Sequence, residues 1–253
     1  MRIKNLIGLM SGTSLDGLDI VLVKFEENEG EVDYTIICSN TVSYPSDLEE
    51  AIKKAHELKI DEAQILDKAI GLFFAAQINT FIEQNKLDQN NIDAIASHGQ
   101  TILHQPENGF TLQLGCGSTI AYHTGIPVIN DFRTLDVVAG GQGATLVPIG
   151  DFQLFKGKAE AFINLGGFCN ISFKVKNEIQ AFDICPSNLP LNKYATLLNA
   201  DYDKNGDFAK AGILNKMLLQ KLNKLGYYTK NAPKSLGTEW LDENFYPLIS
   251  EDL

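Results

Sequence analysis

The sequence predicts an α/β fold whose two halves are organised in a similar way. Each half opens with two apolar segments joined by a turn that contains glycine, at residues 7–23 and again at 161–173. In both halves a further strand-like segment follows, and then stretches of helical periodicity. Because the glycine-rich stretch 133–150 separates the halves, we expect a first domain at residues 1–138 and a second at 139–253.

The strands and the first helix of the first half follow from apolar runs and turn signals. The apolar segments on either side of residues 11–19 predict a hairpin, and the run 34–38 predicts a third strand. Ser46 and Glu49 have the spacing of a capping box, in which a serine caps a helix and a glutamate three residues later binds back. We therefore expect a helix that begins at Ser46.

A second and longer helix is predicted over residues 61–85, because apolar residues recur there at intervals of three and four. Its expected buried stripe comprises Ile65, Ala69, Leu72, Phe73, Ala76 and Phe81. Short apolar runs then predict strands at 92–96 and 126–129, with a further hairpin at 111–115, and the first of these strands should end at Ser97.

The second half is interpreted in the same way. Its hairpin is followed by an apolar run at 179–182, which predicts a strand and puts Asp183 at the end of that strand. Helices are expected over residues 188–198 and 207–225.

The composition limits which kinds of binding partner and which cellular compartment are expected. The 253 residues include 32 acidic and 21 basic side chains, for a net charge of −11, and such an acidic surface repels a phosphate backbone. We therefore expect no nucleic-acid partner. No apolar run looks long enough to span a bilayer, so we expect no membrane association and a cytoplasmic protein. Assembly into a homodimer stays open.

The cysteines and histidines indicate neither a disulfide framework nor a metal centre. No C-x-x-C pair occurs among the scattered residues Cys38, Cys116, Cys169 and Cys185. This usage fits reduced thiols in a cytosol. Metal-ligand spacing is also absent among His56, His104 and His123, so we expect no metal site built from the protein's own ligands.

The turn of the first hairpin has the residue types that a phosphate-binding loop needs. Glycines allow close approach of the backbone, successive N–H groups can form a concavity for an anion, and a neighbouring carboxylate can hold Mg²⁺ directly or through water. An ordinary tight hairpin is the alternative. The residues expected to bind phosphate are Gly12, Thr13, Ser14, Leu15, Asp16, Gly17 and Asp19.

The stretch 8–19, Gly-Leu-Met-Ser-Gly-Thr-Ser-Leu-Asp-Gly-Leu-Asp, resembles the amino-terminal signature of the anhydro-N-acetylmuramic acid kinases. Four later stretches resemble the same family in the same order, and together the five cover essentially the whole chain. The later stretches are 97–101 (SHGQT), 131–133 (DFR) with 139–144 (AGGQGA), 164–170 (NLGGFCN) and 182–183 (FD).

The resemblance implies the fold of sugar kinases, actin and Hsp70, with two ribonuclease-H-like domains. It implies a kinase that uses ATP and Mg²⁺, opens 1,6-anhydro-N-acetylmuramic acid with water and phosphorylates its 6-oxygen in peptidoglycan recycling. Members of the family extend beyond the point that matches Leu253. The second domain is therefore expected to be incomplete, and the activity of these 253 residues alone stays open.

Asp183 is the expected catalytic base, because it resembles the family's aspartate that activates the attacking water. Shielding from water should raise its pKa, which suits a base. The alternative role is an N-cap for the helix that follows. Gly166 and Gly167 are expected to form a second cradle for ATP, with a plain β-turn as the alternative.

Arg133 is expected to bind the lactyl carboxylate of the sugar, because the planar guanidinium fork suits a carboxylate. A salt bridge with Asp131 or Asp136 is the alternative. His98 and Asn188 are expected in the same substrate site, and for His98 a hydrogen-bonded role in the wall of the site stays open.

Two departures from the family pattern bear on the choice of acceptor. The family has glycine on both sides of the proline that follows the aspartate, where this sequence has Cys185 and Ser187. The family also has an aspartate where Asn192 stands. A related sugar kinase with another acceptor, or a non-catalytic protein that binds the sugar or the nucleotide, therefore remain alternatives.

Overall fold

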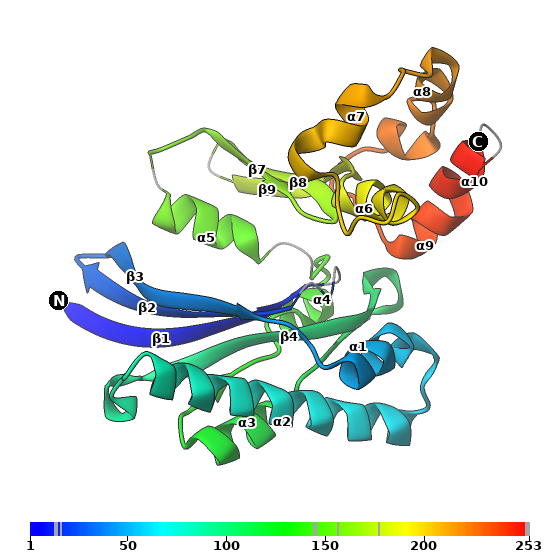
Figure 1. The fold of residues 1–253 in the computed structure, drawn as a ribbon. Coiled ribbons are helices and arrows are strands. Elements are labelled where there is room, and N and C mark those ends of the chain that lie inside the picture. The colour runs from blue at the N-terminus through cyan, green and yellow to red at the C-terminus, as the bar shows by residue number, and fades with distance from the viewer. Residues whose placement is uncertain (13–14, 16, 144–145, 156, 177, 251–253) are drawn as a thin grey trace. The chain divides into compact units, whose positions relative to one another are not determined.

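The computed structural model describes residues 1–253 apart from 13–14, 16, 144–145, 156, 177 and 251–253 (Figure 1). It has the mixed α/β content that the sequence predicts. The chain divides into two compact units, which we call unit 1, Met1–Leu146, and unit 2, Val147–Leu253. Each unit is described by itself.

The division between the units comes later than the predicted boundary, because the glycine-rich loop folds back onto unit 1. The N–H of Gly143 donates to Asp136 Oδ2 at 2.7 Å. The carbonyl of Gly143 accepts a hydrogen bond from Nη1 of Arg133. These contacts tie the loop to helix α4, Thr134–Val138, so the loop belongs with the first half of the chain.

Unit 1 is built on a sheet of strand order β3-β2-β1-β4-β5, in which β6 also pairs with β4. The first three strands form an antiparallel meander, and β4 is parallel to β1 and β6 and antiparallel to β5. The predicted hairpin and third strand are thus confirmed. The strands are β1 Arg2–Ser11, β2 Leu18–Asn28, β3 Glu31–Val42, β4 Ala94–Gln105, β5 Phe110–Leu114 and β6 Val128–Ile129.

Helix α2 lies along one face of this sheet and supplies much of the core of unit 1 (Figure 1). Its Ile70, Phe74 and Ile78 are completely buried, as are Ile7 of β1 and Ile95 of β4. The helices of unit 1 are α1 Ser46–Lys53, α2 Ile60–Gln84, α3 Gly117–Thr124 and α4, with the 3₁₀ turns η1 Ala55–Glu57, η2 Gln89–Asn91 and η3 Pro106–Asn108.

The predicted span of the long helix is confirmed, but its predicted buried stripe is largely wrong. Ile65 is 72% exposed and Leu72 is 39% exposed, whereas Phe73 and Phe74 do contact the core. The helix is apolar on more than one side, so spacing alone defines several stripes, and packing against the sheet selects one of them. The buried residues are Leu66, Ile70, Gly71, Phe74, Ala75, Ile78, Phe81 and Ile82.

By length and composition alone, α2 is also long and apolar enough to cross a membrane, so the expectation that no apolar run reaches that length is wrong. It is the one such helix in the described part of the chain. Its buried side forms the core against the sheet, and core helices commonly pass the same test.

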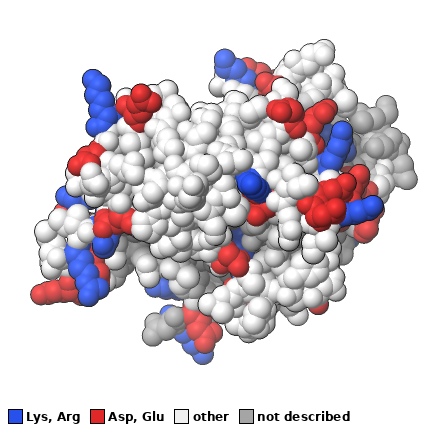
Figure 2. Space-filling model, turned by 90° about the horizontal axis from the view of Figure 1, so that it is seen from below, with Lys and Arg blue, Asp and Glu red and all other residues white. Residues whose placement is uncertain are grey.

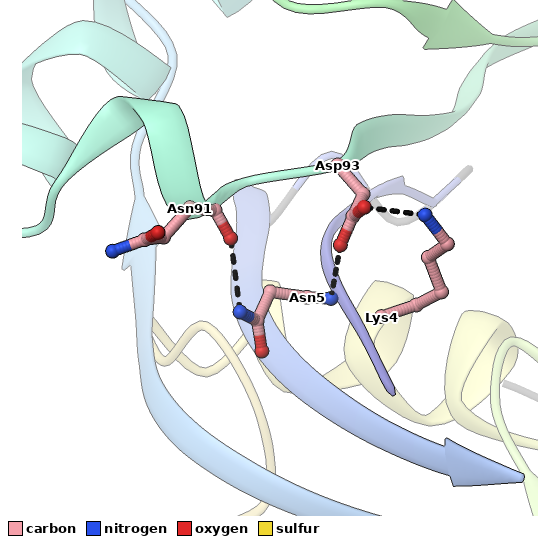
Figure 3. Close-up of polar contacts among 4 residues, drawn as sticks. All are labelled: Lys4, Asn5, Asn91 and Asp93. Atoms are coloured by element: carbon pink, nitrogen blue, oxygen red, sulfur yellow. Dashed lines mark hydrogen bonds and ion pairs between the residues drawn. The ribbon is translucent and has the colours of Figure 1, made fainter. Parts of the chain in front are cut away.

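A small polar cluster fixes the start of the parallel pairing between β1 and β4 (Figure 3). Asp93, just before β4, accepts from the N–H of Asn5 at 2.8 Å and from Lys4 Nζ at 2.5 Å. The N–H of Asp93 donates to the carbonyl of Asn5 at 2.9 Å, and Asn5 Nδ2 donates to the carbonyl of Asn91 at 2.9 Å. The hydrogen bond from Lys4 is the largest cause of the lowered pKa of Asp93.

Helix α1 begins at Ser46, as predicted, but the predicted capping box does not form. Pro45 is the N-cap residue, and no side-chain capping bond is present there. Strand β4 does not end at Ser97 but continues to Gln105, because its later residues pair with β5. The apolar pattern stops at Ser97 although the backbone ladder does not, since polar side chains follow inside the sheet.

Unit 2 contains a three-stranded antiparallel sheet of order β7-β8-β9. Both units therefore open their sheets with a three-stranded antiparallel meander, as the repeated hairpin pattern predicts. The strands are β7 Ala161–Leu165, β8 Phe168–Val175 and β9 Glu178–Pro186. The helices are α5 Val147–Leu154, α6 Asn188–Thr196, α7 Asp207–Ala211, α8 Lys216–Leu222, α9 Thr238–Trp240 and α10 Tyr246–Ser250, with the 3₁₀ turns η4 Lys204–Gly206 and η5 Gly226–Thr229 and the π-helix η6 Leu241–Phe245.

The single helix predicted over 207–225 is two helices, α7 and α8. Gly212 forms the C-cap of α7 in an extended conformation. Asn215 caps α8, and its side chain accepts from the N–H of Leu218 at 3.0 Å. Because asparagine favours a cap over a helix interior, the local sequence breaks the helix where the apolar spacing alone continues it.

Charged side chains of both signs are mixed on the face of the molecule drawn in Figure 2. Lysine and arginine residues there lie among acidic ones, with uncharged residues between them. A nucleic-acid-binding domain typically gathers its basic residues on one face or along one helix. The mixed pattern on this face differs from that arrangement, and the expectation of no nucleic-acid partner stays a prediction.

We predict that Ile70→Ala lowers the free energy of unfolding by about 2–5 kcal/mol, because it removes a completely buried side chain from the core. The matched control is Ile65→Ala on the same helix, where the side chain is 72% exposed and the change should stay within about 0.5 kcal/mol. Urea unfolding of both variants measures the difference. Equal losses of unfolding free energy in the two variants would mean that the side of α2 described as buried is wrong.

Candidate active site

The β1–β2 hairpin carries the predicted phosphate loop at its closed end. Thr13, Ser14 and Asp16 lie outside the described residues, so their predicted roles stay predictions. Leu15 has a φ angle of +55°, and its N–H donates to the carbonyl of Gly12 at 3.2 Å. This hydrogen bond brings the backbone at Leu15 back to Gly12.

Gly17 is required by the packing of this turn. Its φ angle is +150°, and a Cβ atom there would lie 2.8 Å from the carbonyl oxygen of Val42 on β3. Glycine is thus needed for the backbone to approach β3, whatever else the loop does. Asp19 is exposed at the start of β2, and its Oδ1 accepts from Thr41 Oγ1 at 2.5 Å, which orients the carboxylate along the sheet edge.

A buried network of polar side chains lies at the end of β1, directly before the loop. The Ser11 hydroxyl, at the end of β1, donates to Oε1 of Gln100 on β4 and lies 2.5 Å from the Tyr44 hydroxyl. A serine has one proton to donate, so the Tyr44 hydroxyl must donate to Ser11 Oγ. Ser11 is 1% exposed and Gln100 is 2% exposed, so the network is shielded from water and fixes where the loop begins.

His98 and Arg133 form a second polar group in unit 1. Arg133 Nε and Nη2 lie 2.9 Å and 2.7 Å from His98 Nε2. Arginine can only donate, so His98 Nε2 is the unprotonated acceptor and Nδ1 carries the proton, which it donates to the carbonyl of Gly99 at 2.8 Å. Burial, and then the charge of Arg133, lower the pKa of His98, which keeps the ring neutral near pH 7.

Arg133 is held by neutral acceptors. The expected alternative was a salt bridge with Asp131 or Asp136, but Asp131 Oδ1 accepts from the N–H of Thr134 at 3.3 Å and Asp136 Oδ2 accepts from the N–H of Gly143. Among the described residues, no ion pair to Arg133 is found. A half-buried guanidinium without a counter-ion is suited to an anionic ligand, because such a ligand would neutralise it.

Asp183 is held by a distant segment of unit 2. Its N–H donates to the carbonyl of Lys234 at 3.1 Å, and its Oδ2 accepts from the N–H of Leu236 at 2.8 Å. The Tyr227 hydroxyl donates to the carbonyl of Asp183 at 2.7 Å. Burial raises the pKa of Asp183, and the Leu236 hydrogen bond opposes that rise. The direction is the one expected of a general base.

The expected strand end and the N-cap alternative for Asp183 are both wrong. Strand β9 continues to Pro186, and helix α6 has Ser187 at its N-cap. The strand extends because Asp183, Cys185 and Pro186 pair with β8 after the apolar pattern stops, across a register shift at Ile184.

The Gly166–Gly167 turn contacts the start of α6. The carbonyl of Gly167 accepts from the N–H groups of Ser187 and Leu189 at 3.0 Å and 3.3 Å, and the carbonyl of Gly166 accepts from the N–H of Asn188 at 3.1 Å. The Asn188 side chain donates to the carbonyl of Leu165 at 3.1 Å, so its amide supports the turn. In the described structure neither glycine N–H donates to the backbone, which leaves both donors for an anion.

The predicted site residues thus gather into two groups, one in each unit. Unit 1 holds the hairpin loop with the His98–Arg133 pair, and unit 2 holds Asp183 with the glycine turn and Asn188. Ser11 and Gln100 stand in the quoted stretches 8–19 and 97–101, but sequence reasoning did not assign them a supporting role. It did not find the supporting residues Tyr44, Tyr227, Lys234 and Leu236, which act through segments remote in sequence. No cluster of three or more potential metal ligands is found among the described residues.

Comparison with known proteins gives one consistent family. A family model described as anhydro-N-acetylmuramic acid kinase matches residues 4–248. The enzyme of that name from Francisella tularensis subsp. novicida is 40% identical over 257 residues, covering 96% of this chain and 68% of the relative. The one from Shewanella denitrificans is 38% identical over 265 residues, covering 98% of this chain and 70% of the relative.

Similarity to solved structures is low. YeaZ from Pseudomonas aeruginosa has 12% sequence identity and a TM-score of 0.24, over 73% of this chain and 68% of that one. A likeness of this size does not bear on the fold, and the description of each unit as ribonuclease-H-like stays a prediction.

We predict that the pH dependence of stability contains a contribution from His98. The unfolded ring takes up a proton near pH 6.5 and the folded ring only at lower pH, so the unfolded state binds more protons in between. Stability is therefore lost as the pH falls below about 6.5. His98→Gln, which keeps an acceptor but does not titrate, should flatten that part of the curve in urea unfolding.

The control for this prediction is His123→Gln, because His123 is exposed and its ring has no contact with Arg133. It should leave the wild-type curve unchanged. A wild-type curve that matches the His98→Gln curve over the same pH range would contradict the assigned neutral state of His98.

Proposed function

This chain belongs to the anhydro-N-acetylmuramic acid kinase family, and on that premise we propose that it phosphorylates 1,6-anhydro-N-acetylmuramic acid with ATP. Water attacks the anomeric carbon, the internal ether opens, and the freed 6-oxygen takes the γ-phosphoryl group. The product is N-acetylmuramic acid 6-phosphate, an intermediate of peptidoglycan recycling. The use of ATP agrees with the cytoplasmic location expected from the sequence.

The observation that carries this proposal is the state of Asp183. Burial raises its pKa, so the carboxylate is a stronger base than an exposed aspartate. Its Oδ2 is held by the N–H of Leu236, which fixes the carboxylate plane. Oδ1 is then the oxygen that accepts a proton from the attacking water, and general-base catalysis of this kind typically contributes on the order of 10²–10⁴-fold.

Arg133 is proposed to bind the lactyl carboxylate of the sugar. Its Nε and Nη2 are oriented by His98, and its Nη1 is oriented by the carbonyl of Gly143. Both partners are neutral, so the positive charge remains for the substrate. The role of His98 is then to aim the guanidinium, and its ring nitrogens are both already in hydrogen bonds within the protein.

In unit 1, the glycine loop 12–19 is proposed to bind phosphates of ATP. In unit 2, the N–H groups of Gly166 and Gly167 are proposed as a separate phosphate-binding element. The glycine N–H groups of the second turn, which donate to no backbone carbonyl among the described residues, suit an anion. Mg²⁺ would be held mainly by the phosphates, and Asp19 is the described carboxylate of the loop that could support it through water. Bound Mg²⁺ would neutralise the charge that develops on the transferred group.

We predict that Asp183→Asn lowers kcat by on the order of 10²–10⁴-fold. The asparagine Oδ1 can still accept from the Leu236 N–H, so the segment that holds residue 183 should remain in place. The melting temperature should not fall, because a buried charge is removed while its hydrogen bond is kept. Product formation and a thermal melt on the same preparation give the two values.

Asp151→Asn is the matched control, because Asp151 is also a hydrogen-bonded carboxylate of unit 2, with Ser172 as its donor at 2.7 Å. It should change kcat by less than about threefold, which is far smaller than the loss expected when a general base is removed. Similar activities for the two variants would reject Asp183 as the base.

We predict that Arg133→Ala weakens binding of the acidic sugar by roughly 10- to 150-fold, the loss expected of one charge-assisted partner. Binding of neutral 1,6-anhydro-N-acetylglucosamine should change much less, because it lacks the lactyl group. Arg133→Lys keeps the charge but not the fork, so it should recover part of the affinity. Arg2→Ala, at an exposed arginine, is the control for net charge.

Calorimetric titration of both sugars with the wild type and the three variants decides this prediction. Equal weakening for the acidic and the neutral sugar would show that Arg133 acts on the fold of unit 1 rather than on the carboxylate.

A further inference from the structure

Two cysteines face each other across the sheet of unit 2. Cys169 of β8 and Cys185 of β9 are paired in the antiparallel register, and both are free thiols. Residues directly opposite in an antiparallel pair have Cα atoms about 4.5–5.5 Å apart. A disulfide requires a Cα separation of about 4.4–6.8 Å, so this pair meets the requirement without movement of the strands.

The side chains of this pair interact. Besides burial, the neighbouring thiol of Cys169 raises the pKa of Cys185. Cys169 is 7% exposed, whereas Cys185 is only partly buried. The two thiols therefore differ in access, and Cys185 is the one that a reagent in solution can reach.

The position of the pair links the two elements of the candidate site in unit 2. Cys185 lies two residues after Asp183 on β9, and Cys169 lies two residues after Gly167 at the start of β8. The ladder shifts register next to the pair, between Cys169 and Asn170. A covalent bond here would lock that irregular register beside both elements.

We propose that Cys169 and Cys185 form a dithiol site that a low-molecular-weight disulfide oxidises to an intramolecular disulfide. The thiolate of Cys185 attacks one sulfur of the reagent and releases one thiolate, which leaves a mixed disulfide. The Cys169 thiolate then attacks Cys185 Sγ and releases the second thiolate. The protein loses two protons and two electrons, and the reagent is reduced to two thiols.

Burial, and then the neighbouring Cys169, raise the pKa of the Cys185 thiol. The other titratable side chains around it are Tyr227 and Tyr228, whose own pKa values are raised first of all by burial. Because only the thiolate attacks, the exchange should accelerate as the pH rises through the alkaline range.

The test uses oxidised glutathione on the folded protein at mildly alkaline pH, followed by alkylation, trypsin and mass spectrometry. Trypsin cuts after Lys174 and Lys176, so the two cysteines fall in separate peptides and a bond between them is seen as a linked pair. We expect this linked pair to form and to disappear on reduction with dithiothreitol. The double variant Cys38→Ser/Cys116→Ser should give the same result.

Two single variants show which thiol reacts first. Cys169→Ala should accumulate the glutathione adduct on Cys185, because the resolving thiol is gone. Cys185→Ala should react far more slowly, since the remaining thiol is buried. The oxidised wild type should also melt several degrees higher than the reduced protein, because the bond restricts the unfolded chain.

Several outcomes would overturn the proposal. They are glutathione adducts without a linked pair in the wild type, a bond to Cys38 or Cys116 in place of this one, and a linked pair that forms only when urea is added.

Discussion

The parallel pairing of β1 with β4 is the constraint on which unit 1 depends. It is fixed at one end by Asp93 and Asn5 and at the other by the buried bond between Ser11 and Gln100. Because β1 ends at a set position, the glycine loop starts at a set position, and the following hairpin pairs from there. The pairing of β1 with β4 shifts register between Leu9 and Ser11. The shift lies beside the stretch of β4 that contains His98, whose ring accepts a hydrogen bond from Arg133.

The two proposed reactive groups share one electrostatic arrangement. Arg133 is oriented by a neutral imidazole and a backbone carbonyl, and Asp183 is oriented by a backbone N–H. Each group is therefore positioned without an opposite charge that would lower its reactivity. Burial destabilises the charged form of both, lowering the pKa of Arg133 and raising that of Asp183. The positive charge of Arg133 therefore remains available to the carboxylate of the substrate, and the negative charge of Asp183 remains available to a proton.

Sequence reasoning recovered elements that are local and missed those that depend on distant contacts. The hairpins and the long helix follow from periodicity, but the buried side of α2 does not, because that helix is apolar on several sides and the sheet selects one. The pattern likewise ends β4 and β9 too early, because a polar residue interrupts the apolar run in each strand while the pairing with the neighbouring strand continues. The sequence identified Asp183 as a candidate catalytic base. Leu236, whose N–H binds the Asp183 carboxylate, is 53 residues away, and nothing in the sequence around it indicates this contact.

That long-range support has an evolutionary consequence. The orientation of Asp183 depends on the segment Lys234–Leu236, which reaches it through backbone atoms only. These hydrogen bonds to Asp183 do not themselves require particular side chains in the segment, although Lys234 Nζ donates to the carbonyl of Tyr227 and Leu236 is buried. A change in the length of the chain between Tyr227 and Lys234, by contrast, would turn the carboxylate without altering any residue of the strand that bears it. Divergence in reaction rate among related chains can therefore arise from insertions and deletions in a loop that no motif search would inspect.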